Sequence, residues 1–373
     1  MSLKKSGENT KMASYEQNKE NRKWSVRFRF VEFGRAVNKR LSGFKTKKDA
    51  EKAYNEYLTT NLQGNKVNHY NLTFQQLYES YFEYRKPKIK VSTEYDLKTN
   101  FTKHLLPVFG NMKVFEITKR DIFLWQQKME KTSFSYSFKE KLRDYLNAIF
   151  KYAVYYYDLP TNPVTQVEPF ERKEQKKEMQ VWSKEDFIKF INNVDNYEYK
   201  TFYCFLYLTG CRKGEAYALT WDRIDFDKNT VTINKNLTRK VENQVFAIVP
   251  TKTYNTRTIL MPTSLVDMLL ELRNNQNNYK STNYVFGGDY PVADNTITRH
   301  FYSAIEKAGV KKLHLHCLRH SHASLLISQG ESIVMVSKRL GHSSVEQTLN
   351  TYSHLMPNEE EKMVSKLDIK LGT

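Results

Sequence analysis

The chain has 373 residues, a formal net charge of +18 and a hydrophobic content of 40%. Its length suggests two or three domains, and its hydrophobic content excludes a wholly disordered chain. The surplus of positive charge favours a polyanionic partner, nucleic acid before an anionic membrane surface. No apolar run is long enough to span a membrane, and the N-terminus lacks the apolar core of a signal peptide, so we expect a cytoplasmic protein.

The three cysteines do not indicate a structural crosslink. They are odd in number and none of them forms a CxxC pair. The sequence therefore predicts neither a disulfide framework nor a cysteine zinc site.

Residues 1–66 are expected to form a small sheet covered by one helix. We expect disorder over 1–21 because that segment is polar. Residues 24–32 alternate apolar and polar side chains, which predicts a strand, and a second strand is expected over about 35–41. Gly43 is expected to mark the turn that follows. Thr46 and Asp49 resemble a capping box, and an apolar stripe at helical spacing follows them. The stripe consists of Ala50, Tyr54, Tyr57, Leu58 and Leu62.

The exposed face of this sheet is expected to be rich in arginine. Residues 1–66 contain 16 Lys and Arg against 7 Asp and Glu. A basic sheet face can lie in the major groove of DNA. We therefore select Arg27, Arg29 and Arg40 as candidate DNA contacts. The alternative is that they only solvate an exposed sheet face.

Residues 72–167 are expected to form an all-α domain. Helices are expected from a cap at Thr73, over about 92–106, from Thr118 and over about 136–157. The second helix is expected to end before Pro107. No paired carboxylates, glycine-rich loop or metal-ligand spacing occur here, so a binding role is favoured over a catalytic one. Its lysines either neutralise phosphates or form an ordinary solvated surface.

Residues 168–180 are charged and have no apolar period, which is typical of a linker. The remaining residues, 181–373, are expected to form a mixed, mainly helical α+β domain. Within it we expect a helix starting at Ser183, strands near 231–234, 245–249 and 258–260, and helices near 263–277 and 294–308.

Residues 313–355 concentrate side chains that could act on a phosphate. His316 and Arg319 lie within one helical turn, His342 follows after a helix-sized interval, and Tyr352 comes ten residues later. Cations can hold the non-bridging oxygens of a phosphodiester while a phenol attacks the phosphorus. His320 and His322 are expected to pack the helix.

The order of five elements resembles the tyrosine recombinase (phage integrase) family. They are TGCRKGE at 209–215, Lys252 in a turn, HCLRH at 316–320, LGH at 340–342, and Tyr352. The basic sheet, the helical domain and this last domain together resemble the three-domain integrases of prophages and conjugative transposons. The resemblance implies a multi-domain fold: an arm-binding domain (1–66), a core-binding domain (72–167) and a catalytic domain (181–373).

The resemblance also implies site-specific recombination through a 3′-phosphotyrosyl bond. The candidate catalytic residues are Arg212, Lys252, His316, Arg319, His342 and Tyr352. Arg212 and Arg319 would bind the phosphate, and Tyr352 would attack it. His316 is the favoured proton acceptor, and Lys252 would protonate the leaving 5′-oxygen. Glu215 could hold a guanidinium in place.

Two residue assignments stay open at this point. Arg257 either supports the strands around Lys252 or contacts a phosphate. The apolar spacing of residues 363–371 suits docking on a neighbouring subunit or on the chain's own.

The implied partners are double-stranded DNA with core and arm-type sites, a homo-tetramer on that DNA and an accessory directionality factor. No cofactor and no metal ion are expected. Two alternatives remain. A zinc-dependent nuclease would use the histidines near Cys317, although no HExxH glutamate is present. A non-catalytic DNA-binding regulator would use the basic sheet alone.

Overall fold

The computed structural model describes residues 13–18, 21–32, 35–57, 71–172, 179–252 and 255–352. The chain forms two compact units, one of Met1–Lys88 with Lys98–Glu171 and one of Ile89–Leu97 with Arg172–Thr373. Among the helices so described, none is long and apolar enough to cross a membrane. The apolar positions in residues 363–371 lie outside the described residues.

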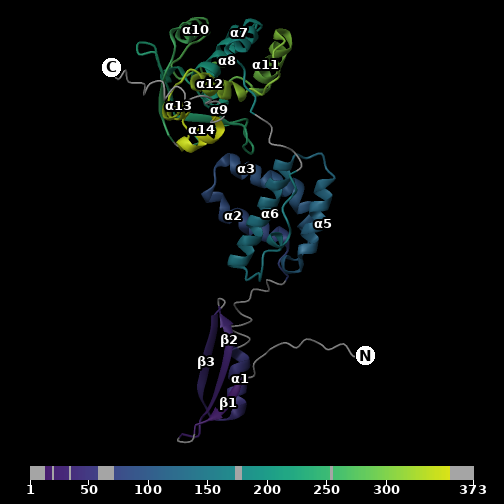
Figure 1. The fold of residues 1–373 in the computed structure, drawn as a ribbon. Helices are drawn as coiled ribbons and strands as arrows, with labels where there is room; N and C mark the ends of the chain where they lie inside the picture. The colour runs from purple at the N-terminus through teal and green to yellow at the C-terminus, as the bar shows by residue number, and fades with distance from the viewer. Residues whose placement is uncertain are drawn as a thin grey trace, which may run out of the picture. The chain divides into compact units, whose positions relative to one another are not determined.

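The N-terminal sheet has three antiparallel strands in the order β1-β2-β3, which are β1 (Ser14–Gln17), β2 (Trp24–Glu32) and β3 (Arg35–Phe44). Helix α1 (Lys47–Tyr57) lies along the sheet (Figure 1). The predicted inward face is confirmed at Val26 and Phe28, which are both buried, and the Phe28 ring contacts Tyr54 and Tyr57 of the helix. Leu58 and Leu62 of the predicted stripe lie outside the described residues.

Two predictions for this sheet are wrong. Residues 14–17 are not disordered, because β1 pairs with β2 and the Tyr15 ring packs edge-on against Tyr54. Gly43 is not in a turn but inside β3, where it is an extra residue between two pairings, Trp24 with Phe44 and Ser25 with Ser42. Its φ of +102° suits glycine, and the irregularity is a β-bulge. The capping box is confirmed, since the Asp49 carboxylate accepts from the Thr46 backbone N–H.

The helical part of the first unit consists of α2 (Phe74–Arg85), the end of α3 (Val91–Asn100), α4 (Leu106–Phe109), α5 (Lys119–Glu130) and α6 (Tyr136–Tyr156). The helix starts predicted at Thr73 and Thr118 are confirmed, and each is a capping box. The predicted end before Pro107 is wrong. A π-helical turn over Phe101–Leu105 follows α3, and Pro107 lies in the first turn of α4, where its missing N–H leaves no hydrogen bond unmade.

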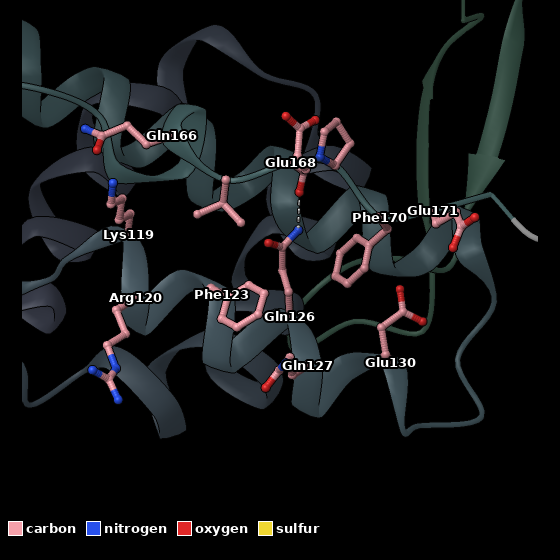
Figure 2. A pocket seen from close by; sticks show the side chains of 12 residues that line it. Lys119, Arg120, Phe123, Gln126, Gln127, Glu130, Gln166, Glu168, Phe170 and Glu171 are labelled. Atoms are coloured by element: carbon pink, nitrogen blue, oxygen red, sulfur yellow. Dashed lines mark hydrogen bonds between the residues drawn. The ribbon is translucent and has the colours of Figure 1, made fainter.

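The first part of the predicted linker is packed against α5. Phe170 is buried against Trp125, and Gln126 Nε2 donates to the Glu168 carbonyl at 3.1 Å. Figure 2 shows this hydrogen bond at the edge of a surface pocket of about 550 Å³, with the Phe123 and Phe170 rings facing it. The linker prediction therefore fails for 168–171, because the sequence pattern does not show that one aromatic anchors the segment. Residues 173–178 lie outside the described residues.

Eight helices and five short strands are described in the second unit after residue 179. The helices are α7 (Lys184–Asn192), α8 (Tyr197–Thr209), α9 (Lys213–Tyr217), α10 (Thr263–Asn274), α11 (Asp294–Ala308), α12 (Cys317–Ser328), α13 (Ile333–Leu340) and α14 (Val345–Tyr352). Helix α8 is apolar on nearly every side and is buried in the core, as its composition requires. The predicted fold class is confirmed. It consists of a small sheet with a helix, an all-α part and a mainly helical α+β part.

The strands differ from prediction around Lys252. Strands β4 (Ile224–Asp225), β5 (Thr230–Ile233) and β8 (Arg257–Leu260) form one sheet, and β6 (Lys235–Thr238) and β7 (Ala247–Pro250) form another. The sequence did not predict β6. Ile233 pairs with Arg257 and Lys235 pairs with Pro250, so β5 and β6 continue into pairings with two different strands. Lys252 follows β7 and precedes β8, and these strands belong to different sheets, so it does not lie in a two-strand hairpin turn.

Candidate active site

The site begins where α8 ends. Gly210 has a φ of +66°, and a Cβ on it would lie 2.4 Å from His322 Cδ2, so this turn requires glycine. The turn places Arg212 at the N-cap of α9. The Arg212 backbone N–H donates to Glu215 Oε2 at 2.9 Å, and its Nη1 donates to Oε1 at 3.0 Å. The Glu215 carboxylate thus contacts both the backbone and the guanidinium of Arg212.

Glu215 also binds a second arginine. Arg257 Nη2 lies 2.6 Å from Glu215 Oε2, and Arg257 Nη1 lies 3.2 Å from Oε1. Burial raises the pKa of the Glu215 carboxyl, but the hydrogen bonds and charges of Arg257 and Arg212 outweigh it and hold the pKa below its ordinary value. Arg257 Nε further donates to the Arg339 carbonyl at 3.0 Å. Of the two roles considered for Arg257, these contacts support the structural one.

Arg319 lies in α12 and is only 4% exposed. Its Nη1 donates to the Gly210 carbonyl at 2.6 Å, and its Nη2 donates to the Leu340 carbonyl at 2.8 Å. Burial is the main cause that lowers its pKa to about 10, so the guanidinium stays charged at neutral pH. Arg212 also reaches the end of α13, where its Nη2 donates to the Gly341 carbonyl at 3.4 Å.

The two arginines are thus held by carbonyls at helix ends. Gly210 closes α8 and Gly341 closes α13, both in the left-handed conformation. The last carbonyls of a helix have no partner within the helix and carry partial negative charge. The guanidinium groups satisfy these carbonyls, which fixes both cations at the junction of α8, α12 and α13.

Two histidines lie near these arginines. His316 is the N-cap of α12, and His342 follows α13, with its Nδ1 2.7 Å from Thr348 Oγ1. Burial first, then neighbouring positive groups that include Arg319 and Arg212, lowers the pKa of each imidazole to about 4. Both rings are therefore neutral at pH 7, and each can donate one N–H and accept at its other nitrogen.

Tyr352 is the last described residue of the chain and ends α14. It is 1% exposed and packs with Ala323, Ile327, Val336 and Leu340. Its hydroxyl oxygen lies 2.7 Å from His320 Nδ1. Burial raises the pKa of the phenol to about 12, while the charge of Arg319 opposes this rise. The geometry joins a phenol, two guanidinium groups and neutral imidazoles, which is a set suited to phosphoryl transfer.

Comparisons with known proteins identify the family of this chain. The model of the phage integrase family matches residues 179–359, and that of the phage integrase N-terminal SAM-like domain matches 73–130. The ICEBs1 integrase of Bacillus subtilis strain 168 is 30% identical over 298 residues, which cover 74% of this chain and 80% of that protein. The chain belongs to the phage integrase family. It is a tyrosine-type site-specific recombinase.

Other relatives of this recombinase agree in family and fold. The XerC-like tyrosine recombinase of Caldanaerobacter subterraneus subsp. tengcongensis is 27% identical over 369 residues, covering 90% of this chain and 93% of that one. A solved structure of the Tn1549 transposon integrase, in complex with a circular intermediate DNA, aligns with a TM-score of 0.67 at 19% identity and covers 79% of this chain and 99% of that one. A lambda integrase dimer bound to a COC′ core site aligns with a TM-score of 0.57 at 14% identity, covering 96% and 97% of the two chains.

The recombinase departs from prediction at one of two histidines in α12. For His322 the packing role is observed, because it is buried and its Nε2 accepts from Arg339 Nε at 3.1 Å. For His320 the packing role needs correction, because its ring lies against the Tyr352 hydroxyl. Within the described residues, the histidine at hydrogen-bonding distance from that hydroxyl is His320 and not His316. The i,i+4 spacing of His316 and His320, which puts both on one helix face, was the signal in the sequence.

Arg339 is a second residue that the sequence did not single out. Its Nη2 donates to the Leu208 carbonyl near the end of α8, and its Nη1 donates to the Leu260 carbonyl of β8. These bonds tie α13 to both elements. No motif marks such a residue, because its partners are backbone carbonyls.

Lys252 is exposed, and its neighbours Thr253 and Tyr254 lie outside the described residues. Its backbone carbonyl accepts from Lys90 Nζ at 2.7 Å, inside the same compact unit. Within the part of the chain that the structure describes, no hydrogen bond joins the Lys252 ammonium to the histidines of the site.

The candidate DNA contacts of the N-terminal sheet lie side by side. Arg27 and Arg40 are paired across β2 and β3, and both are exposed. Arg27 Nε is 3.7 Å from Glu16 Oε2, and Arg40 Nη2 donates to Ser25 Oγ at 3.1 Å. The side chain of Arg29 lies outside what the structure describes.

The zinc alternative was also tested against the geometry. Among the described residues, no three side chains of His, Cys, Asp or Glu come close enough together to hold a metal ion. The histidines around Cys317 therefore do not form a ligand set there.

Proposed function

We propose that this recombinase cuts and rejoins DNA strands through a 3′-phosphotyrosyl bond on Tyr352, and so integrates and excises a mobile element or prophage. The observation that carries the proposal is the gathering of the Tyr352 phenol with Arg212, Arg319 and neutral histidines at one helix junction. The resulting covalent bond conserves the energy of the phosphodiester, so a second strand can be joined without ATP.

Arg212 and Arg319 would hold the scissile phosphate. A guanidinium has five N–H donors, and the carbonyl bonds of Arg319 use two of them. The remaining donors are available for the non-bridging oxygens, where negative charge develops in the transition state. Because the carbonyls fix both groups in advance, little reorganisation accompanies the reaction. Glu215 would support the site by orienting Arg212.

Neutral His316 and His342 would add hydrogen bonds to the phosphate. Lys252 would act as the general acid that protonates the 5′-oxygen as it leaves. In this role the ammonium of Lys252 would reach the 5′-oxygen of the bound DNA, and Lys252 is exposed, which leaves it accessible to DNA.

The partner would be double-stranded DNA, bound by three domains: an arm-binding domain over 1–66, a core-binding domain over 72–167 and a catalytic domain from 181. The net charge of +18 supports this partner. Arg27 and Arg40 would contact arm-type sites. The working assembly would be a homo-tetramer on two duplexes, as the lambda integrase tetramer on a Holliday junction illustrates for that protein. An accessory directionality factor and a cytoplasmic location complete the proposal.

The test is covalent trapping on a suicide substrate that carries the DNA ends of the element encoding the gene. The wild-type chain is expected to form an adduct that survives SDS electrophoresis, and Tyr352→Phe is expected to bind the same DNA without forming it. A normal adduct yield from Tyr352→Phe would refute the assignment. Cleavage that a chelator abolishes while Tyr352→Phe stays active would establish the zinc nuclease. Binding by the wild type without any adduct would establish the regulator.

A further inference from the structure

A histidine outside the predicted catalytic set contacts the proposed nucleophile. We propose that His320 is the catalytic residue that accepts the proton of Tyr352 during strand cleavage and returns it when the strand is rejoined. This inference rests on the proposed function, because it assigns a partner to the phenol that the proposal makes the nucleophile.

The geometry of the pair carries this assignment. His320 Nδ1 and Tyr352 Oη are 2.7 Å apart, and the ring centroids are 6.0 Å apart. A general base must lie within about 2.6–3.2 Å of the atom whose proton it takes, and this pair meets that condition. The side chain of Tyr352 is 1% exposed, so bulk water does not compete as the acceptor.

The surroundings keep His320 ready to accept a proton. Burial, and next the charge of Arg319, lowers its pKa below the ordinary value, which leaves the imidazole neutral at pH 7. The other titratable groups around it are His316 and Cys317 on its own helix, His342 after α13 and Tyr352 itself. The three of them with shifted pKa values carry no negative charge at pH 7, because burial raises the pKa of the Tyr352 phenol and lowers those of the His316 and His342 imidazoles. With the proton of the neutral ring on Nε2, Nδ1 is the acceptor that faces the hydroxyl.

His316 is placed for a different role. Its ring stands edge-on to that of His320, with an interplanar angle of 90° and centroids 5.1 Å apart. Burial lowers the pKa of His316 most, and the charges of His320, Arg319 and Arg212 lower it further, so the ring is neutral at pH 7. A neutral ring suits a hydrogen bond to the phosphate that the arginines hold, while His320 serves the nucleophile.

The proton balance closes without a further reactant. As the Tyr352 oxygen attacks, its O–H bond breaks and the proton moves to His320 Nδ1. The oxygen forms a bond to phosphorus, the bond from phosphorus to the 5′-oxygen breaks, and the leaving oxygen takes a proton from the general acid proposed above. During rejoining, the imidazolium gives its proton back to the departing phenolate.

The decisive variant is His320→Asn in the full chain. The Asn Oδ1 can take the place of Nδ1 and keep the hydrogen bond from the Tyr352 hydroxyl, but an amide does not take up the proton. We expect Tm and DNA binding close to wild type, and single-turnover adduct formation on the suicide substrate about 10²–10⁴-fold slower. His314→Asn is the matched control, because His314 Nδ1 makes a similar contact, 3.1 Å from the exposed Tyr302 hydroxyl, and is expected to leave the rate unchanged.

A more acidic nucleophile separates proton transfer from a purely structural role. Incorporating 3,5-difluorotyrosine at position 352 lowers the pKa of the phenol and so lessens the need for a base. The defect of His320→Asn is expected to shrink by at least tenfold in this background, and that of His316→Asn is expected to stay the same.

Two results would overturn the assignment. One is adduct formation by His320→Asn within threefold of wild type, and the other is a fluorotyrosine effect equal in the two histidine variants. The proposed function is judged separately, because it fails only if Tyr352→Phe still forms the adduct.

Discussion

The arginines of the N-terminal sheet and those of the catalytic unit show two different uses of the same side chain. Arg27 and Arg40 are exposed, and Arg27 has a long ion pair to Glu16, with both side chains more than half exposed. Arg319 and Arg257 are buried, and each makes several short hydrogen bonds. An exposed pair contributes little to stability and leaves the cation available to a ligand. A buried arginine is fixed in place, and removing its partners is costly.

The difference comes from what each fold offers as a partner. The open sheet face offers one hydroxyl and one distant carboxylate. The catalytic unit offers the carbonyl ends of α8 and α13 and the buried Glu215 carboxylate. Net charge counted along the sequence does not distinguish these cases. We therefore expect substitutions at the two places to have effects of different kind and size.

Lys252 is the strongest challenge to this comparison, because it is exposed and yet proposed to act in the chemistry. Lys252→Ala is expected to slow single-turnover cleavage by about 10²–10⁴-fold, since an alkoxide is a poor leaving group without a proton donor. A substrate with sulfur at the bridging 5′ position needs no such proton and is expected to restore the rate. The measurement is adduct formation over time with the two substrates.

Lys235→Ala is the control for that experiment. Lys235 is an exposed lysine on β6, and it pairs with Pro250, which lies two residues before Lys252. It is expected to leave both rates unchanged. If the sulfur substrate fails to rescue Lys252→Ala, Lys252 is not the acid.

Glu215→Gln tests the buried side of the comparison. The substitution keeps the shape but removes the charge that pairs with Arg257 and Arg212. Leaving buried guanidinium groups without their anion is expected to lower the free energy of unfolding by about 3–5 kcal/mol. Chemical denaturation followed by circular dichroism measures this loss.

Asp195→Asn is the matched control for Glu215→Gln. The Lys307–Asp195 pair has the same 2.6 Å separation as the Arg257–Glu215 pair, but its side chains are 53% and 83% exposed. No measurable change in stability is expected. Equal effects of the two substitutions would show that burial does not decide the strength of these pairs.

The sequence predicted much of this fold because its local signals agree with the tertiary structure. The helix starts predicted at Thr73, Thr118 and Ser183 are confirmed, and each of them is a capping box. The prediction from sequence failed for the edge strand β1, where a polar segment is held in place by pairing with β2. Strand pairing depends on a partner that local composition does not show.

The candidate site could be predicted only as a set of residues and not as a set of contacts. The order of motifs selected Arg212, Arg319 and Tyr352, which the structure brings together. The contact between His320 and Tyr352 depends on how α12 and α14 pack, and the role of Arg257 depends on the direction of β8. Helix packing and strand direction are tertiary properties, so spacing along the chain did not decide the roles of His320 and Arg257.

Acid is expected to weaken the catalytic unit selectively. The imidazoles of His316 and His342 have their pKa lowered from 6.5 to about 4 in the folded chain, chiefly by burial. The unfolded chain therefore binds more protons in this range, and stability falls as the pH drops from about 6.5 to about 4. Thermal unfolding at several pH values between 7.5 and 4.5 measures the effect.

The N-terminal sheet provides an internal reference for the acid experiment. Residues 1–66 contain no histidine, so the described strands β1–β3 lack this source of pH dependence. Amide hydrogen exchange followed by mass spectrometry is expected to show protection falling in α12–α14 between pH 6.5 and 5 and staying nearly constant in the sheet. Equal loss in both places would contradict a histidine origin.

The smallest effect is expected at the exposed arginines. The double variant Arg27→Ala, Arg40→Ala is expected to keep the Tm of the wild type, because neither side chain has a strong partner to lose. Its rate of core-site cleavage is expected to stay within about twofold of wild type. Binding to arm-type DNA is expected to weaken, and the slope of log affinity against log salt is expected to fall by about one for each arginine that contacts a phosphate. Filter binding at several salt concentrations measures the slope.

Arg257→Ala is expected to have the opposite pattern of effects. It should lower stability and leave the salt slope unchanged, because the guanidinium of Arg257 is occupied by Glu215. A salt slope that responds to Arg257 but not to Arg27 and Arg40 would invert the comparison and place the phosphate contacts in the catalytic unit alone.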